Sequence, residues 1–212
     1  MRFMGIIKKN VFKNMTDEYL KKCYVPDVYQ KDIYSIDYQQ LKNAGVKLIT
    51  FDIDDTIAGL LTANPSRTAI TLFENLKNMG FELDIMSNTW EKRAVHFANE
   101  LGIVGKNLGN AEKPLTVKYK KALELYGLQE HEMAHVGNCI ADDVAGGKAA
   151  GIVTCLVRRS GVAGKIFSPD EDDLIDELKK RGIWRKHHKE NKNDQYYQLG
   201  KLPGYIIDAQ KD

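Results

Sequence analysis

The sequence predicts an α/β domain in which helices cover both faces of a parallel sheet, a three-layer α/β/α arrangement. Two observations predict it. Short apolar, β-branched runs alternate with helical segments of about ten to fifteen residues, a pattern typical of parallel strands joined by helical crossovers. Polar or acidic residues also follow directly after several of these runs, where open parallel sheets bind their ligands.

The composition is that of an ordinary globular protein. Of the 212 residues, 43% are hydrophobic and 28% are charged, and 31 Lys and Arg stand against 29 Asp and Glu. The resulting net charge of +2 argues against a globally basic nucleic-acid binder. No apolar run reaches the roughly 18 residues of a membrane span, and no signal-peptide core follows Met1. Widely spaced Cys23, Cys139 and Cys155 fit reduced thiols. We therefore expect a cytoplasmic protein.

The first half of the chain contains clear start and stop signals. The first forty residues are expected to be irregular or short-helical, because Pro26 would interrupt any long helix. A buried strand is expected at 46–51, directly after Gly45. The next helix is expected to begin with Asn64 as its N-cap and Pro65 in its first turn, and to end at Gly80.

The later elements follow the same signals. Pro114 is expected in the first turn of a helix that ends at Gly127. We further expect strands at 81–86, 133–137 and 152–157, a short strand or turn at 103–104, and helices at 90–101, 114–126, 143–150 and 169–180. The chain divides into an N-terminal arm (1–43) packed on or flanking the core, a core (44–160), and a C-terminal helix with a polar tail (161–212).

Asp52, Asp54 and Thr56 follow the first strand. Side chains alternate along extended backbone, so Asp52 and Asp54 can point to the same side. Two carboxylates suit a hard cation such as Mg²⁺, and one of them can act as a nucleophile on phosphorus. The other interpretation, a solvated turn, is weakened by the apolar strand that precedes the pair.

Two further clusters are ambiguous when taken alone. Ser87-Asn88-Thr89 follows the second strand and could grip a phosphoryl oxygen, although it is also a common N-cap sequence. Lys113 at a helix start would lie at the unfavourable end of the helix dipole, which a phosphate or carboxylates would compensate. An ordinary exposed lysine is the alternative.

The fourth cluster, Gly137 to Asp143, follows another short strand and could return one or two carboxylates to the same metal. Four such clusters in this order resemble the haloacid dehalogenase (HAD) superfamily of phosphohydrolases. The wider pattern resembles its YqeG-like branch in subfamily IIIA, through Pro26-Asp27, the lead-in from Leu41 to Lys47, and Asp143 to Gly147. The resemblance covers roughly residues 20–160 and implies a Rossmann-like core and a Mg²⁺-dependent phosphatase, a metal-binding hydrolase.

The resemblance also implies roles for single residues. Asp52 would be the nucleophile and a Mg²⁺ ligand, and Asp54 the general acid/base that binds the metal through its backbone carbonyl. Ser87, the adjacent Asn88 and Thr56 would bind substrate. The remaining roles are that Thr56 orders the loop, Lys113 neutralises the phosphoryl group and holds Asp52, and Asp143 completes the metal site.

Asn138 departs from the family pattern, which has Asp at this position. An amide oxygen can ligate Mg²⁺ but removes one negative charge. This change has three alternative consequences: the metal binds more weakly, Asp142 takes over the role, or activity is lost. We expect a working site, because Asp52 and Asp54 are both present. The alternative is a catalytically weakened HAD-fold protein that binds phosphate or acts as a scaffold.

The spacing between the motifs leaves no room for a large cap domain. About 30 residues separate Asp54 from Ser87, whereas domains rarely fall below about 50 residues. An open site suits a large or lipid-linked phosphate, and relatives of the YqeG-like branch imply phosphatidylglycerophosphate as a candidate. The basic and apolar residues before Asp17 fit either an anchor on anionic lipid or an amphipathic arm. We expect no nucleic acid and no obligate protein partner, and His187-His188 to be a surface pair rather than a metal site.

Overall fold

A parallel sheet forms the centre of the protein. The computed structural model describes residues 12–60, 62–106, 109–158, 169–184 and 197–198. Within them the strand order is β3-β2-β4-β5-β1-β6, with every neighbouring pair parallel except β1 and β6. The strands are β1 (Val28–Gln30), β2 (Leu48–Phe51), β3 (Glu82–Ile85), β4 (Met133–Gly137), β5 (Val153–Val157) and β6 (Tyr197–Gln198).

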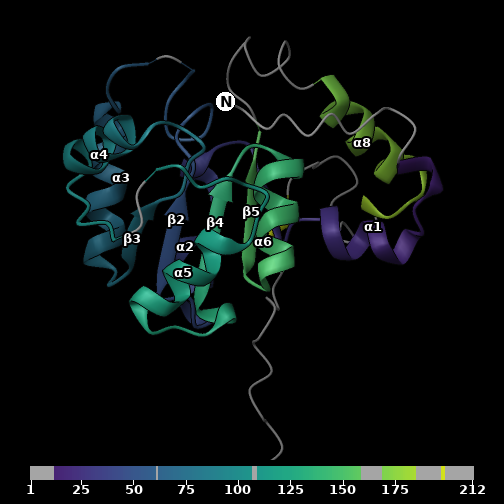
Figure 1. Ribbon diagram of the computed structural model, residues 1–212, viewed down its shortest axis with the longest axis horizontal. Helices are drawn as coiled ribbons and strands as arrows, with labels where there is room; N and C mark the ends of the chain where they lie inside the picture. The colour runs from purple at the N-terminus through teal and green to yellow at the C-terminus, as the bar shows by residue number, and fades with distance from the viewer. Residues whose placement is uncertain (1–11, 61, 107–108, 159–168, 185–196, 199–212) are drawn as a thin grey trace, which may run out of the picture.

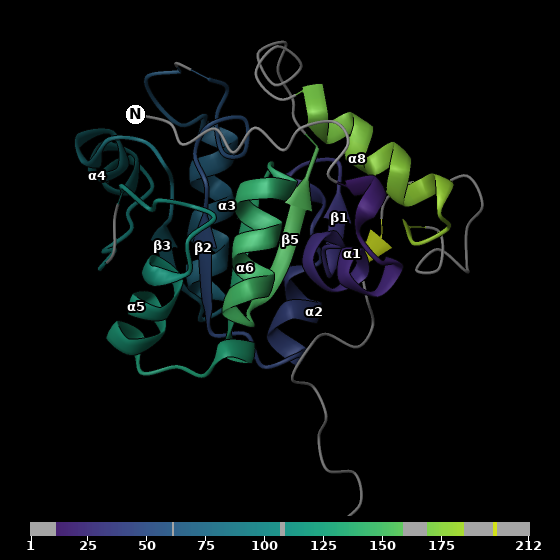
Figure 2. The same cartoon turned by 45° about the vertical axis from the view of Figure 1, so that its right-hand side comes forward.

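Helices connect the strands and cover the sheet (Figures 1 and 2). The α-helices are α1 (Asp17–Tyr24), α2 (Tyr38–Asn43), α3 (Arg67–Asn78), α4 (Glu91–Glu100), α5 (Val117–Tyr126), α6 (Ala145–Ala150) and α8 (Pro169–Lys180). Short 3-10 helices are η1 (Phe12–Asn14), η2 (Ile33–Ser35) and η3 (Glu130–Glu132), and η4 (Ile140–Val144) is a π-helix.

Alternate residues of β2 pack against opposite helical layers. Ile49 and Phe51 of β2 lie in one core with residues of α2, α3 and α4, where the rings of Phe51 and Phe73 are 4.7 Å apart. Leu48, one position earlier, packs in a different core with Tyr119 of α5. Because the strands are buried on both faces, the three-layer α/β/α fold predicted from the sequence is confirmed.

A further core joins the two ends of the described chain. Tyr29 of β1 and Leu156 of β5 pack there with residues of α1, η4 and α8. The ring of Trp184, which follows α8, meets Tyr29 edge-on at 5.2 Å. Arg181 donates hydrogen bonds to the carbonyls of Phe12 and Met15. The last helix described is thereby fixed against the first.

The prediction that the first forty residues are irregular or short-helical missed β1. This strand lies beside β5 because Asp27 binds the neighbouring strand several times. Asp27 Oδ2 accepts hydrogen bonds from the backbone N–H of Thr154 at 2.9 Å and from its hydroxyl at 3.0 Å, and Lys148 Nζ lies 2.5 Å from Asp27 Oδ1. Three residues are too few to show a strand period, so only the partner strand reveals β1.

Helices α3 and α5 begin later than predicted, and α6 begins at Ala145 rather than Asp143 because residues 140–144 form a π-helix. Helix α3 begins at Arg67, and Ser66 is its N-cap because its hydroxyl accepts a hydrogen bond from Ala69 N at 3.1 Å. The side chain of Asn64, the cap expected from sequence, is instead 2.7 Å from His96 Nε2. Helix α5 begins at Val117, so Lys113 lies before the helix rather than in its first turn. No strand forms at 103–104.

The segments between the first three motifs hold only α3, β3 and α4 among the residues described, so the prediction of no large cap domain is confirmed. None of the described helices has the length and apolar character needed to cross a membrane. The basic N-terminal segment and the His187-His188 pair lie outside the described residues.

Candidate active site

The predicted site residues meet at the carboxyl edge of the sheet, the end toward which the strand arrows point in Figure 1. Asp52 follows β2, Ser87 follows β3, and Gly137 ends β4. The strand register continues into the site, since Asp52 N donates to Val136 O at 2.9 Å and Met86 N donates to Phe51 O at 2.8 Å. Neighbouring strands therefore deliver three separate motifs to one place.

Lys113 lies between two carboxylates at the centre of this edge. Its Nζ is 2.8 Å from Asp52 Oδ1 and 2.5 Å from Asp143 Oδ1, and only 3% of the residue is exposed. Burial alone would lower the pKa of Lys113, but Asp143 and Asp52 outweigh it and raise the pKa well above its ordinary value. Lys113 is therefore a permanently charged ammonium held against Asp52.

The two carboxylates have different surroundings. Burial, together with the nearby charge of Asp143, raises the pKa of Asp52 despite the opposing effect of Lys113. Burial would also raise the pKa of Asp143, but Lys113 and His135 together lower it below its ordinary value. Asp143 is thus the firmly ionised member of the pair, and Asp52 is the more exposed of the two buried carboxylates, at 7% against 2%.

Asp143 is bound by protein groups through both of its oxygens. Oδ1 meets Lys113 Nζ and His135 Nε2, the latter at 3.0 Å, and Oδ2 accepts from Cys139 N at 2.9 Å. The carboxylate folds back over Gly137, where an added Cβ would lie 2.1 Å from Asp143 Cγ. The glycine of this motif is therefore required by the close approach of Asp143.

Asp54 points to a different partner. Its Oδ1 lies 2.7 Å from Arg93 of α4, and the same guanidinium donates to Thr62 O at 2.7 Å. Arg93 also stacks over the Phe97 ring, with 4.7 Å from its central carbon to the ring centroid. Sequence reasoning missed Arg93. Its position one turn into the helix that follows Ser87-Asn88 is the signal that could have indicated it.

The remaining predicted residues frame the site. Ser87 is buried and hydrogen-bonds to Asp52, and Asn88 binds the backbone of Lys113. Thr56 closes a turn by donating its N–H to Ile53 O at 3.2 Å, and its buried hydroxyl has no partner among the described residues. Asn138 and Asp142 are half-buried beside Asp143.

The oxygen donors of this edge suit a hard cation. Asp52 follows β2 and Asn138 follows β4, the strand next to it in the sheet, so carboxylate, backbone carbonyl and amide oxygens come to this edge from Asp52, Asp54 and Asn138. Over the described residues, no group of three His, Cys, Asp or Glu side chains is arranged to hold a metal. The donors are of the oxygen type that Mg²⁺ prefers, and both oxygens of Asp143 already accept hydrogen bonds from protein groups.

A histidine that sequence reasoning missed lies behind Asp143. His135 of β4 is 1% exposed, and burial lowers its pKa although the neighbouring Asp143 opposes this effect. Its Nδ1 lies 2.9 Å from the hydroxyl of Thr50 on β2, its direct partner in the strand register. A polar residue at the same alternate position in two buried strands is the signal that could have indicated this pair.

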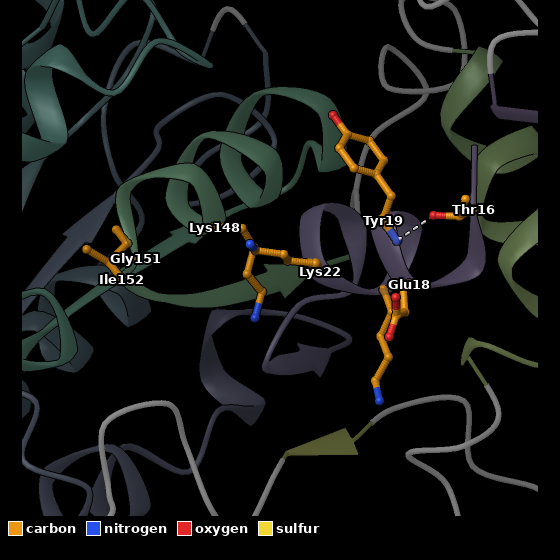
Figure 3. A pocket seen from close by; sticks show the side chains of 8 residues that line it. Thr16, Glu18, Tyr19, Lys22, Lys148, Gly151 and Ile152 are labelled. Atoms are coloured by element: carbon orange, nitrogen blue, oxygen red, sulfur yellow. Dashed lines mark hydrogen bonds between the residues drawn. The ribbon is translucent and has the colours of Figure 1, made fainter. Parts of the chain in front are cut away.

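A separate cavity of about 830 Å³ lies between α1 and the end of α6 (Figure 3). Lys21, Lys22 and Lys148 line it, and Figure 3 shows Gly151 and Ile152 on the side away from Tyr19 of α1. None of the predicted site residues lines this cavity. It begins beside the amino end of β5, away from the edge that holds Lys113.

Comparisons with known proteins agree with the motif arrangement. A model of the family described as haloacid dehalogenase-like hydrolase matches residues 32–151, more than half of the chain. The chain therefore belongs to the haloacid dehalogenase-like hydrolases. The resemblance predicted from the four motifs, to a HAD phosphatase of the YqeG-like branch, is confirmed.

Individual proteins that are similar to this chain include a curated relative and two solved structures. The chain is 30% identical over 167 residues to "Probable phosphatase YqeG" of Bacillus subtilis (strain 168), covering 77% of this chain and 96% of that protein. A solved structure of an uncharacterized protein from Listeria monocytogenes serotype 4b is 20% identical with a TM-score of 0.45, covering 64% of this chain and 99% of that one. A 3-deoxy-D-manno-octulosonate 8-phosphate phosphatase from Moraxella catarrhalis, solved with magnesium, phosphate and KDO, is 14% identical with a TM-score of 0.42, covering 69% and 99%.

Proposed function

We propose that the protein hydrolyses phosphomonoesters through an aspartyl-phosphate on Asp52. The observation that carries this proposal is the placement of Asp52 beside a buried, charged Lys113, with a second carboxylate, Asp54, on the same strand end and held by Arg93. A nucleophile, a fixed positive charge and a separate acid/base group are the parts that phosphoryl transfer through a carboxylate requires.

In the first step, an oxygen of Asp52 attacks phosphorus and the bond from phosphorus to the ester oxygen breaks. Lys113 stabilises the negative charge on the phosphoryl oxygens, and the Ser87 hydroxyl and the N–H groups that follow it offer hydrogen bonds. Asp54 gives its proton to the departing alcohol oxygen, so the alcohol leaves neutral. The product is an acyl phosphate on Asp52.

In the second step, water attacks the phosphorus of the acyl phosphate and Asp54 takes its proton. The bond between phosphorus and the Asp52 oxygen breaks, which releases inorganic phosphate and restores the carboxylate. Arg93 keeps Asp54 at the mouth of the site through both steps, because its guanidinium is itself fixed to Thr62 O.

We propose Mg²⁺ as the cofactor, held by Asp52, the Asp54 carbonyl and Asn138, with Asp143 or Asp142 joining directly or through water. When bound, the cation supplies positive charge against the phosphoryl oxygens. Asp143 contributes chiefly through Lys113, because both of its oxygens already accept hydrogen bonds from the protein. The proton and nucleophile chemistry belongs to Asp54 and Asp52.

For the substrate, we propose a large or lipid-linked phosphate, with a phosphatidylglycerophosphate-type lipid as one candidate. The support is the open site and the apolar side chains on the segments that follow two of its motifs. Trp90, just after Ser87-Asn88-Thr89, is 79% exposed, and Leu115 and Val117, just after Lys113, are 56% and 63% exposed. An amphipathic leaving group could rest on these side chains while its phosphate enters the polar site.

The first experiment is hydrolysis of p-nitrophenyl phosphate with Mg²⁺ by wild type and Asp52→Asn. We expect the variant to lose at least about 10³-fold in kcat, because no carboxylate oxygen remains to attack. EDTA is expected to suppress the wild-type rate and Mg²⁺ to restore it. Equal rates in wild type and Asp52→Asn would contradict the nucleophile assignment.

Asn138 favours a second candidate, a HAD-fold phosphate-binding or scaffold protein with weakened catalysis. Calorimetric Mg²⁺ titration separates the two, since no binding at millimolar metal supports the scaffold. The lipid proposal, with a cytoplasmic protein that associates peripherally with anionic membrane, predicts binding to phosphatidylglycerol vesicles that weakens with salt. Failure to bind such vesicles at low salt would remove the lipid proposal and leave the phosphatase proposal intact.

A further inference from the structure

A continuous line of buried polar side chains runs from β2 through β4 to the site. Thr50 Oγ1 is 2.9 Å from His135 Nδ1, and His135 Nε2 is 3.0 Å from Asp143 Oδ1. The same Asp143 oxygen is 2.5 Å from Lys113 Nζ, which is 2.8 Å from Asp52. The line connects a sheet-interior threonine to the carboxylate that attacks phosphorus.

We propose that His135, oriented by Thr50, is a positioning residue: its Nε2–H fixes the Asp143 oxygen that holds Lys113 against Asp52 and the incoming phosphate. The inference rests on the proposed function, since it assigns Lys113 its place relative to the phosphoryl group. His135 touches neither substrate nor the reacting atoms and acts only through Asp143.

The direction of the hydrogen bond between His135 and Asp143 follows from Lys113. Lys113 can only donate, so Asp143 Oδ1 is an acceptor and His135 Nε2 donates to the same oxygen. On the other side of the ring, Nδ1 lies 2.9 Å from the Thr50 hydroxyl, which also donates to Ala134 O at 3.3 Å. Thr50 therefore contacts the ring at Nδ1 while Nε2 faces Asp143.

The surroundings hold the ring in one orientation. Thr50 and His135 are direct partners across β2 and β4, and their side chains lie on the same face of the sheet. The Tyr119 ring meets the imidazole edge-on, with centroids 5.3 Å apart and an angle of 76° between the planes. Both Thr50 and His135 are essentially unexposed. The imidazole is therefore held in one orientation by close packing, and its hydrogen bond fixes the position of the Asp143 oxygen.

Asp143 needs such support because one of its oxygens serves two donors. Without the Nε2–H donor, Oδ1 of Asp143 has only Lys113 as a partner, while Oδ2 stays hydrogen-bonded to Cys139 N. The carboxylate can then rotate with Oδ2 held in place and Oδ1 displaced. Lys113 would follow it away from Asp52. Lys113 stabilises charge in the transition state, so its displacement lowers kcat more than it weakens ground-state binding.

The test compares variants that keep or remove one hydrogen bond. His135→Gln can place an N–H where Nε2 lies, whereas the shorter His135→Asn cannot reach Asp143. Thr50→Ser keeps the hydroxyl, and Thr50→Val removes it at constant shape. For p-nitrophenyl phosphate, we expect kcat to fall about 10–100-fold in His135→Asn and about tenfold in Thr50→Val. His135→Gln and Thr50→Ser should stay within about threefold of wild type, with KM within about twofold in all four.

A merely structural histidine gives a different result. In that case kcat per folded molecule stays at the wild-type level in every variant, or Gln and Asn lower it equally, and either outcome overturns the inference. Thermal unfolding of each variant supplies the folded fraction. Thr50→Val is isosteric, so the inference stays testable if His135→Asn fails to fold.

The failure of the proposed function is recognised separately. Wild type that is no faster than Asp52→Asn removes the phosphatase proposal, whatever the His135 variants do. The ¹⁵N spectrum of the histidine rings then judges the inference without activity, with His135→Gln identifying the signal. A ring with a proton on Nε2, whose signal changes on Thr50→Val, supports the inference, and a ring without a proton on Nε2 overturns it.

Discussion

Asn88 and Lys113 bind each other through two hydrogen bonds of opposite direction. Asn88 Nδ2 donates to Lys113 O at 3.1 Å, and Lys113 N donates to Asn88 Oδ1 at 2.8 Å. A third bond, from Ala111 N to Ser87 O at 3.0 Å, lies beside them. The segment that carries Lys113 is thereby attached to the end of β3, and the orientation of the site lysine depends on the Asn88 amide.

Asn88→Ala tests this attachment. We expect kcat for p-nitrophenyl phosphate to fall about tenfold, because the loss of two hydrogen bonds frees the backbone that aims Lys113. The loss in stability should be about 1–2 kcal/mol in urea unfolding. Asn78→Ala, which removes an exposed amide from α3, is the matched control. An active Asn88→Ala enzyme with wild-type kcat would show that Lys113 needs no such support.

Arg93 is expected to govern Asp54. Arg93→Gln removes the charge that lies 2.7 Å from Asp54 Oδ1, so the general acid loses its fixed position and kcat should fall about tenfold or more. Stability should change by less than about 1 kcal/mol, because the pair is partly exposed. Arg67→Gln, at an exposed position on α3, serves as the control. A large loss of stability without loss of kcat would make Arg93 a structural residue instead.

Lys113→Met should destabilise the protein strongly. The change leaves Asp52 and Asp143 buried together without their shared cation, a loss of about 3–5 kcal/mol in denaturant unfolding. Adding Asp143→Asn should recover part of this loss, because one stranded charge disappears. Lys120→Met, at an exposed position, is expected to change stability little. If Lys113→Met proved as stable as Lys120→Met, the buried ion triad would be excluded.

Asp27 is expected to hold β1 in the sheet. Asp27→Ala removes the acceptor for Thr154 and the partner of Lys148, so the free energy of unfolding should fall by about 2–4 kcal/mol. Amide hydrogen exchange should accelerate first in Val28–Gln30. Asp27→Asn keeps one acceptor oxygen and should show an intermediate effect. Unchanged exchange in β1 would mean that its backbone pairing with β5 suffices.

Parts of the fold that have a local signal could be predicted. The run Met133–Gly137 shows its strand by composition and its end by glycine, and the structure has β4 at these bounds. The helix at 169–180 likewise matches α8. The predicted start of α3 was wrong because Asn64, Pro65 and Ser66 are all residues that favour a helix start. The contact of Asn64 with His96, which the sequence does not show, leaves Ser66 as the N-cap of α3.

The sequence by itself determined the order of the strands and helices from β2 to α8, the three-layer fold and the placement of Asp52, Asp54 and Ser87 after strands and of Gly137 at a strand end. These features follow from hydrophobic period and from Gly and Pro, which act over a few residues. The tertiary structure decided which charges meet: Asp52 with Lys113, 61 residues apart, and Asp54 with Arg93, 39 residues apart. It also placed the buried Thr50 and His135 behind Asp143, because the pairing of two strands that lie 85 residues apart in the chain sets which side chains face each other.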